Sequence, residues 1–252
     1  MKRLVQPLIY LLAIAPLILL MSFCWPAKSI TIYLAGDSTM SDKNIRAYPE
    51  TGWGMPFALF FDSTVTVKNI AKNGRSTKTF ITEGLWKQIS TQLKAGDYVF
   101  IQFGHNDESP AKSSYTPEAD YKNNLRLFIK ETKAKNAIPI LITPVSRRKF
   151  NTAGQIEETH QIYSGLVHEV AQEQQVQLID LDKESRALYQ ELGPENSKML
   201  FLQLKPGENP NYPEGKTDNT HFNEMGARKI AEIVWREIKK QQLSLADRIY
   251  KK

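Results

Sequence analysis

Cysteine is nearly absent from this sequence, whose 252 residues include only Cys24, close to the N-terminus. A lone cysteine cannot form an internal disulfide or a cysteine-based zinc site, so a hydrophobic core must hold the fold together. Apolar residues make up 41% of the sequence, which supports such a core and argues against intrinsic disorder. The sequence has no zinc-ligand set, phosphate-binding glycine loop or nucleic-acid motif. We therefore expect no metal, no organic cofactor and no nucleic-acid partner.

The sequence also lacks an apolar run of full membrane-spanning length. The apolar stretch 8–21 is short for a transmembrane helix, and it follows the basic residues Lys2 and Arg3. This order is typical of a secretory signal. We expect residues 1–29 to be a signal peptide or a retained N-terminal anchor, and residues 30–252 to be one folded domain. The protein would then be periplasmic or secreted, and it would meet a membrane only through a retained anchor.

The excess of positive charge gives little information about partners. The formal net charge is +6, but removing residues 1–29 deletes the cations Lys2, Arg3 and Lys28 and lowers it to +3. The sequence pI of about 9.2 is therefore weak evidence for nucleic-acid binding. Cleavage would also remove Cys24, which leaves the mature domain without thiol chemistry.

The remainder of the chain alternates between strand-like and helix-like segments. Apolar runs predict strands at 30–36, 98–103, 138–143 and 176–181, and the alternation of apolar and polar residues predicts another strand at 65–71. Helical spacing predicts helices at 53–61, 79–93, 116–135, 156–174, 183–192 and 224–242. The proline-containing stretch 203–220 is expected to be irregular. Continuous apolar strands between helices indicate an α/β fold with a five-stranded parallel sheet, covered on both faces as a three-layer α/β/α domain.

Polar turn residues follow the first three predicted strands. Ser38, Gly74 and Asn106 each lie just after a strand, and ligands of an open parallel sheet bind beyond the carboxyl ends of its strands. Asp218 and His221 lie just before the last predicted helix, where a loop could fold back over the same edge. We therefore expect these five residues to form one site.

The residue types at this edge suit acyl transfer. Ser38 could attack a carbonyl carbon once a base removes its proton, and His221 is the natural base because histidine is the residue type whose side chain most readily exchanges a proton near neutral pH. Asp218 could accept the other ring N–H of His221 and so select the tautomer. The backbone N–H groups of Ser38 and Gly74 and the side-chain amide of Asn106 could form an oxyanion hole.

These residues also carry a family resemblance. They belong to four blocks in the order Gly36–Ser38, Gly74, Gly104–Asp107 and Asp218–His221. The blocks resemble those of the SGNH (GDSL) hydrolases, which implies a flavodoxin-like fold, the same three catalytic residues and the same oxyanion hole. One departure from the lipase form of the first block is Thr39, where lipases have leucine.

Within that clan, the chain looks most like the rhamnogalacturonan acetylesterases. The segments that carry this likeness are Leu34–Met40, Gly52–Gly54, Phe103–Asp107 and Thr220–Phe222. The resemblance implies a serine esterase that removes O-acetyl groups from a plant cell-wall polysaccharide, most specifically rhamnogalacturonan in pectin. Arg147 and Arg148 follow the fourth predicted strand, where they could pair with galacturonate carboxylates or could be ordinary solvated loop residues.

Other functions stay open from the sequence alone. An SGNH esterase could act on acetylated xylan, another glycan, a lysophospholipid or a thioester. A non-catalytic glycan-binding module of the same fold is a further alternative, although a base-paired serine has no use in a pure binder. Of the remaining candidates, we expect His105 to orient its neighbours, Asp107 to cap a turn, and His160 and His168 to be surface histidines.

Overall fold

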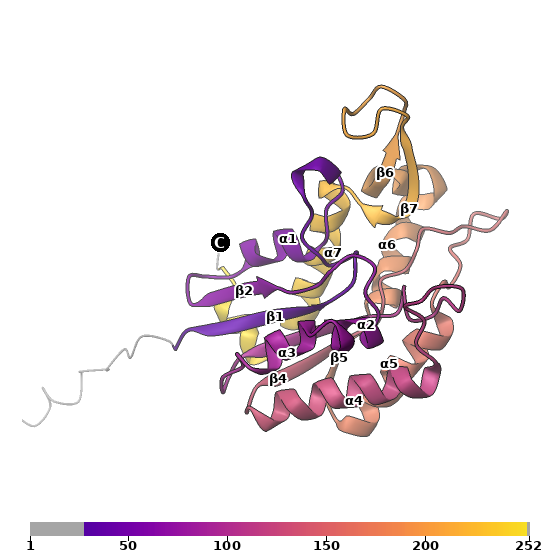
Figure 1. The fold of residues 1–252 in the computed structure, drawn as a ribbon. Coiled ribbons are helices and arrows are strands. Elements are labelled where there is room, and N and C mark those ends of the chain that lie inside the picture. The colour runs from indigo at the N-terminus through magenta and orange to yellow at the C-terminus, as the bar shows by residue number, and fades with distance from the viewer. Residues whose placement is uncertain (1–27, 251–252) are drawn as a thin grey trace, which may run out of the picture.

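The computed structural model describes residues 28–250 and has a central sheet with helices on both faces (Figure 1). Five parallel strands form this sheet in the order β2-β1-β3-β4-β5, which is the flavodoxin-like order. The strands are β1 (Ile30–Gly36), β2 (Val65–Asn69), β3 (Tyr98–Gln102), β4 (Ile138–Ile142) and β5 (Gln177–Ile179). The predicted three-layer α/β/α fold is confirmed. The predicted signal peptide or anchor lies outside the described residues, except for its last two positions.

Alternate side chains of the central strands enter two separate cores. Ile32 and Phe100 pack on one face of the sheet, and Val99 and Ile101 pack on the other. One face is covered by α1 (Gly54–Phe57), α6 (Leu181–Asn196) and α7 (Glu224–Lys240). The other is covered by α2 (Thr77–Thr82), α3 (Leu85–Ser90), α4 (Glu118–Ala134) and α5 (Gln161–Gln174). Burial on both faces explains why these strands are continuous apolar runs. No helix within residues 28–250 is long and apolar enough to cross a membrane.

The helix predicted over 79–93 is two helices, α2 and α3. Gly84 separates them with a φ of +76°, a left-handed conformation that ends one helix before the next begins. Ser76 starts α2 through a capping box with Thr79, in which each side chain satisfies the other residue's backbone N–H. The apolar spacing therefore continued across a break that the glycine imposes.

The stretch 203–220 is not wholly irregular, which corrects our prediction. Strands β6 (Phe201–Leu204) and β7 (Lys216–Phe222) pair antiparallel, and the ribbon projects beyond the main sheet (Figure 1). Most side chains of β7 are polar and at least partly exposed, and its register with β6 shifts between Phe201 and Gln203. The strand therefore lacks the apolar alternation on which the prediction depended.

Gly52 packs against the turn that follows β1. A Cβ atom at Gly52 would lie 2.0 Å from the carbonyl oxygen of Ser41. The next residue, Trp53, is fully buried, and its Nε1 donates to Gln102 Oε1 at 2.6 Å. Gln102 in turn donates from Nε2 to Thr39 Oγ1 at 2.8 Å. Close backbone packing and this buried chain of hydrogen bonds join the turn to β3.

We expect Gly52→Ala to destabilise the protein by about 3 kcal/mol, because backbone must move to admit the methyl group. Urea unfolding monitored by circular dichroism measures the change. Gly165→Ala is the matched control, since Gly165 lies within α5 and, beyond the neighbouring backbone of that helix, a Cβ there meets no atom of residues 28–250 within 4 Å. The control should be neutral or slightly stabilising. Equal stability of Gly52→Ala and wild type would contradict the packing argument.

Candidate active site

A tight turn after β1 presents Ser38 at the carboxyl edge of the sheet. The backbone oxygen of Asp37 accepts from the N–H groups of Met40 and Ser41 at 3.3 and 3.0 Å. The buried Asp37 side chain accepts through Oδ1 from the backbone N–H of Thr39 at 2.9 Å and from its hydroxyl at 2.8 Å. These hydrogen bonds stabilise the turn over residues 37–41, and Ser38 within it is only partly buried.

The structure brings Ser38, His221 and Asp218 into one hydrogen-bonded line. Ser38 Oγ lies 2.9 Å from His221 Nε2, and His221 Nδ1 lies 2.8 Å from Asp218 Oδ2. The other oxygen of Asp218 accepts from the backbone N–H groups of Thr220 and His221 at 2.7 and 3.0 Å. Asp218 and His221 both belong to β7, not to a loop, so the ribbon carries them over the edge of the main sheet.

The hydrogen bonds around Asp218 set its ionisation. Burial on its own raises the pKa of this carboxyl, but the bonds from the His221 side chain and from two backbone N–H groups outweigh it and hold the pKa below its usual range. Asp218 is therefore a carboxylate at neutral pH. A carboxylate accepts the Nδ1–H of His221, which leaves Nε2 as the acceptor for the Ser38 hydroxyl.

Gly74 and Asn106 flank the serine turn because β1 lies between β2 and β3. Gly74 is exposed in the turn after β2 with a φ of +77°. Asn106 is buried after β3, and its Nδ2 donates to the backbone oxygen of Arg75 at 3.1 Å. An amide nitrogen carries two N–H groups, so the second can serve a substrate oxygen. This arrangement is able to surround a reacting carbonyl with donors.

The two predicted substrate-binding arginines have different surroundings. Arg147 donates to Thr220 Oγ1 at 2.9 Å and pairs with Glu108 at 3.3 Å, and its side chain keeps 34% exposure in a pocket of about 470 Å³. Arg148 donates to Ser197 Oγ and Asn219 Oδ1, each at 2.9 Å, and to the backbone oxygen of Pro194. Arg147 is therefore next to β7, which carries Asp218 and His221, and is open to a ligand, whereas Arg148 connects segments of the protein.

Asp107 supports the start of α2. Its Oδ1 accepts from the backbone N–H of Thr77 at 2.8 Å and from the Thr77 hydroxyl at 2.6 Å. Asp107 thus satisfies an N–H group that has no partner within the helix. Burial raises the pKa of Asp107 to about 7, although the bonds from Thr77 act in the opposite direction.

This raised pKa predicts a loss of stability with increasing pH. A group whose folded pKa exceeds its unfolded value stabilises the fold fully below the unfolded pKa, which is about 3.9 for aspartate. The contribution is lost as the pH rises toward and past 7. We expect wild type to lose on the order of 4 kcal/mol relative to Asp107→Asn between pH 4 and pH 8. Urea unfolding of both proteins across that range measures it, and a constant difference would contradict the prediction.

The prediction for His160 is wrong, because this histidine is buried. The helix predicted from residue 156 begins at Gln161, and His160 lies at its N-cap, with Nδ1 2.8 Å from Glu108 Oε2. Its ring packs edge-on against that of His105, with centroids 4.2 Å apart. Burial pushes the pKa of His105 well below its usual range, so His105 is neutral at pH 7. His168 is exposed, as predicted.

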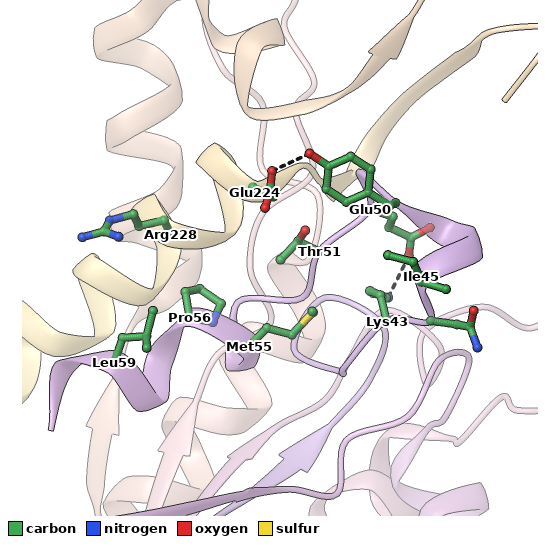
Figure 2. Close-up of a pocket in the computed structure, with 11 residues that line it drawn as sticks. Lys43, Ile45, Glu50, Thr51, Met55, Pro56, Leu59, Glu224 and Arg228 are labelled. Atoms are coloured by element: carbon green, nitrogen blue, oxygen red, sulfur yellow. Dashed lines mark hydrogen bonds and ion pairs between the residues drawn. The ribbon is translucent and has the colours of Figure 1, made fainter. Parts of the chain in front are cut away.

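Two further residues at the site were missed by the sequence analysis. Glu108 bridges Arg147 and His160 through its two oxygens. Lys43 donates to the backbone oxygen of Ser38 at 2.6 Å and pairs with Glu50 at 2.7 Å. Figure 2 shows this pair at the edge of a pocket of about 460 Å³ between the loop after β1 and the starts of α1 and α7. Lys43 lies in a polar stretch of turn formers, which carries no motif.

The fold and this arrangement of side chains define the class of the protein. The chain belongs to the GDSL-like lipase/acylhydrolase family, whose model matches residues 34–229. It is therefore a carboxylic ester hydrolase, and the predicted family resemblance is confirmed. Within residues 28–250, no group of three or more His, Cys, Asp or Glu side chains is placed to hold a metal ion.

Within this family, the chain is similar to proteins of Bacillus subtilis. The chain is 41% identical over 222 residues to the rhamnogalacturonan acetylesterase RhgT of Bacillus subtilis, covering 88% of this chain and 95% of RhgT. It is 36% identical to the probable rhamnogalacturonan acetylesterase YesY of the same organism, covering 87% and 97% of the two chains. The crystal structure of Bacillus subtilis YxiM superposes with a TM-score of 0.75 at 31% identity. That match covers 87% of this chain but only 58% of YxiM.

Proposed function

We propose that this protein is an acetylesterase that removes O-acetyl groups from a plant cell-wall polysaccharide, most specifically rhamnogalacturonan. The observation that carries the proposal is the line from Ser38 to His221 to Asp218, with distances of 2.9 and 2.8 Å. A serine hydroxyl in this setting has a base to take its proton and a carboxylate to orient that base. The names of the relatives RhgT and YesY support the choice of substrate.

The proposed reaction has two halves. Ser38 Oγ attacks the acetyl carbonyl carbon while His221 Nε2 takes the hydroxyl proton. The carbonyl electron pair moves to oxygen, and N–H donors from Ser38, Gly74 and Asn106 stabilise the resulting oxyanion. When the tetrahedral intermediate collapses, the bond between the acetyl carbon and the sugar oxygen breaks, and His221 gives the proton to that departing oxygen, so the acetyl group stays on Ser38. Water then attacks the acetyl carbon while His221 takes its proton, and as the bond to Ser38 Oγ breaks His221 returns that proton to Ser38 and acetate leaves.

A panel of acetylated substrates tests the choice of polysaccharide. We expect acetate release from acetylated rhamnogalacturonan to exceed that from acetylated xylan in kcat/KM, and long-chain esters to be poor substrates. Faster acetate release from acetylated xylan would indicate a xylan esterase in place of the proposed enzyme, and a preference for long acyl chains would favour a lipid substrate.

We also propose that Arg147 binds a galacturonate carboxylate of the substrate. Arg147→Gln is expected to lower kcat/KM on acetylated rhamnogalacturonan about 10-fold, since a hydrogen bond to a charged group is worth about 1.5–3 kcal/mol. Hydrolysis of neutral p-nitrophenyl acetate should change little. Arg126→Gln on α4, which removes a partly exposed arginine paired with Glu173, is the matched control. Equal losses on the acidic and neutral substrates would contradict the carboxylate contact.

The place of action is a further part of the proposal. A polysaccharide substrate requires an enzyme outside the cytoplasm, and the basic and apolar start of the sequence supports export. N-terminal sequencing of the protein recovered from the culture medium or the periplasm tests this. Cleavage near residue 29 is expected, and recovery only from the cytoplasm would contradict it.

A further inference from the structure

Lys43 is an enclosed cation that connects two turns of the site. Its side chain is 2% exposed, and its Nζ contacts three oxygens. These are the backbone oxygen of Ser38 at 2.6 Å, Asn73 Oδ1 at 2.7 Å and Glu50 Oε1 at 2.7 Å. An ammonium group has three donors and no acceptor, so it can satisfy three converging oxygens at once. Figure 2 shows the contact of Lys43 with Glu50.

The contacts of Lys43 act on both sides of the proposed oxyanion hole. Ser38 carries one N–H donor, and Asn73 directly precedes Gly74, which carries another. Ser41 reinforces the same connection, because its Oγ donates to Asn73 Oδ1 at 2.5 Å. Lys43 therefore holds the serine turn and the turn after β2 at a defined separation.

Gly74 depends on its neighbours for its position. It is exposed, and apart from Asn73 and Arg75 no residue in the described range 28–250 has an atom within 4 Å of the position a Cβ would take. On one side, Asn73 is bound by Lys43 and Ser41, and on the other the backbone oxygen of Arg75 accepts from Asn106 Nδ2. The contacts of Asn73 and Arg75 therefore fix the direction of the Gly74 N–H.

We propose that Lys43 is a positioning residue that aims the Gly74 N–H at the oxyanion by bracing Asn73 against the Ser38 turn. The inference rests on the proposed esterase mechanism and adds a residue to it. Burial lowers the pKa of Lys43, whereas the bond and charge of Glu50 oppose that change and favour the charged form. A positive charge beside the turn also favours the negative oxygen that develops there.

The test is Lys43→Met, which keeps an unbranched side chain of most of the length and removes its donors. We expect kcat for p-nitrophenyl acetate to fall about 100-fold with KM changed less than about 3-fold, because a misplaced donor affects the transition state most. Labelling of Ser38 by a fluorophosphonate, which also forms a tetrahedral oxyanion-like adduct, should slow in parallel. Lys133→Met is the matched control, since Lys133 also donates to a backbone oxygen, that of Gln174, on the surface. The control should keep wild-type rates.

A double variant separates positioning from general damage. Asn73→Ala should reproduce most of the loss in kcat. The double variant with Lys43→Met and Asn73→Ala should have a kcat no more than about 3-fold below that of Lys43→Met alone, because both substitutions remove the same hydrogen bond between Lys43 and Asn73. Lys43→Arg should recover part of kcat. The inference is overturned if Lys43→Met keeps kcat within about 3-fold, if its loss only follows the unfolded fraction in circular dichroism, or if the two single losses multiply. An inactive wild type would instead refute the esterase proposal itself.

Discussion

Replacing His221 with alanine is expected to lower kcat for acetyl-ester hydrolysis by about 10⁵- to 10⁶-fold. Without the imidazole, no described side chain within hydrogen-bond distance of Ser38 Oγ can take its proton, because the one side-chain partner found there is His221 Nε2 at 2.9 Å. The base is needed in both halves of the reaction, so acylation and deacylation should both slow. Initial rates with p-nitrophenyl acetate, and with acetylated rhamnogalacturonan, measure the effect.

The control for this prediction is the combination of His221→Ala with Ser38→Ala. Residues that act as one unit lose little more when both are removed, so the double variant should resemble either single variant. Exposed His168, which lies on α5, provides a histidine for comparison, and His168→Ala should keep wild-type kcat. A His221→Ala variant with more than about one-tenth of wild-type activity would rule out His221 as the general base.

Asp218→Asn is expected to lower kcat by about 10⁴-fold while leaving the fold intact. The asparagine oxygen can still accept from the backbone N–H groups of Thr220 and His221, which Asp218 Oδ1 now accepts. Its amide nitrogen would then face His221 Nδ1 and donate to it. That donation places the ring proton on Nε2, where it points at Ser38 and blocks proton removal.

Proton NMR provides a direct observation of this tautomer change. Wild type should show a strongly downfield resonance from the His221 Nδ1–H that is bound to the Asp218 carboxylate, and Asp218→Asn should lack it. Thermal unfolding provides the control for folding, because the variant should retain a cooperative transition. Full activity in Asp218→Asn would mean that the carboxylate does not select the tautomer.

The sequence was sufficient to predict the central sheet for a physical reason. The central strands β1, β3 and β4 are buried on both faces and are continuous apolar runs, and a polar turn follows each of β1, β2 and β3. Ser38, Gly74 and Asn106 could therefore be assigned to one edge before the strand order was known. Asp218 and His221 were also predicted to lie at that edge, but on a loop and not on a strand. The reason is that β7 is mostly polar, so apolar periodicity does not predict it.

The residues missed by the sequence analysis act through contacts between distant segments. His160 was placed on a helix surface by its neighbours in sequence, yet Glu108 and His105 enclose it from another loop. Lys43 looks like a solvated lysine in a turn, and only the approach of Asn73 and Glu50 makes it an enclosed cation. Helical periodicity and turn propensity describe local structure, so neither contains information on such pairings.

The local rules also explain where helix boundaries shifted. Gly84 adopts a left-handed conformation that apolar spacing cannot reveal, and it divides one predicted helix into α2 and α3. Asp180 caps the start of α6 through the Lys183 N–H, so the helix begins at Leu181 and not at 183, and Gly193, with a φ of +74°, interrupts it just after the predicted end at 192. Neither shift moves the site, which depends on strand ends and on β7.

The most direct test of the central claim is acetate release from acetylated rhamnogalacturonan by wild type and by Ser38→Ala. Ser38→Ala removes one oxygen from a partly buried side chain, so folding should be unaffected. We expect wild type to release acetate steadily and Ser38→Ala to be indistinguishable from the uncatalysed control. Equal acetate release by the two proteins would contradict a Ser38 acyl-enzyme and the account of the site built on it.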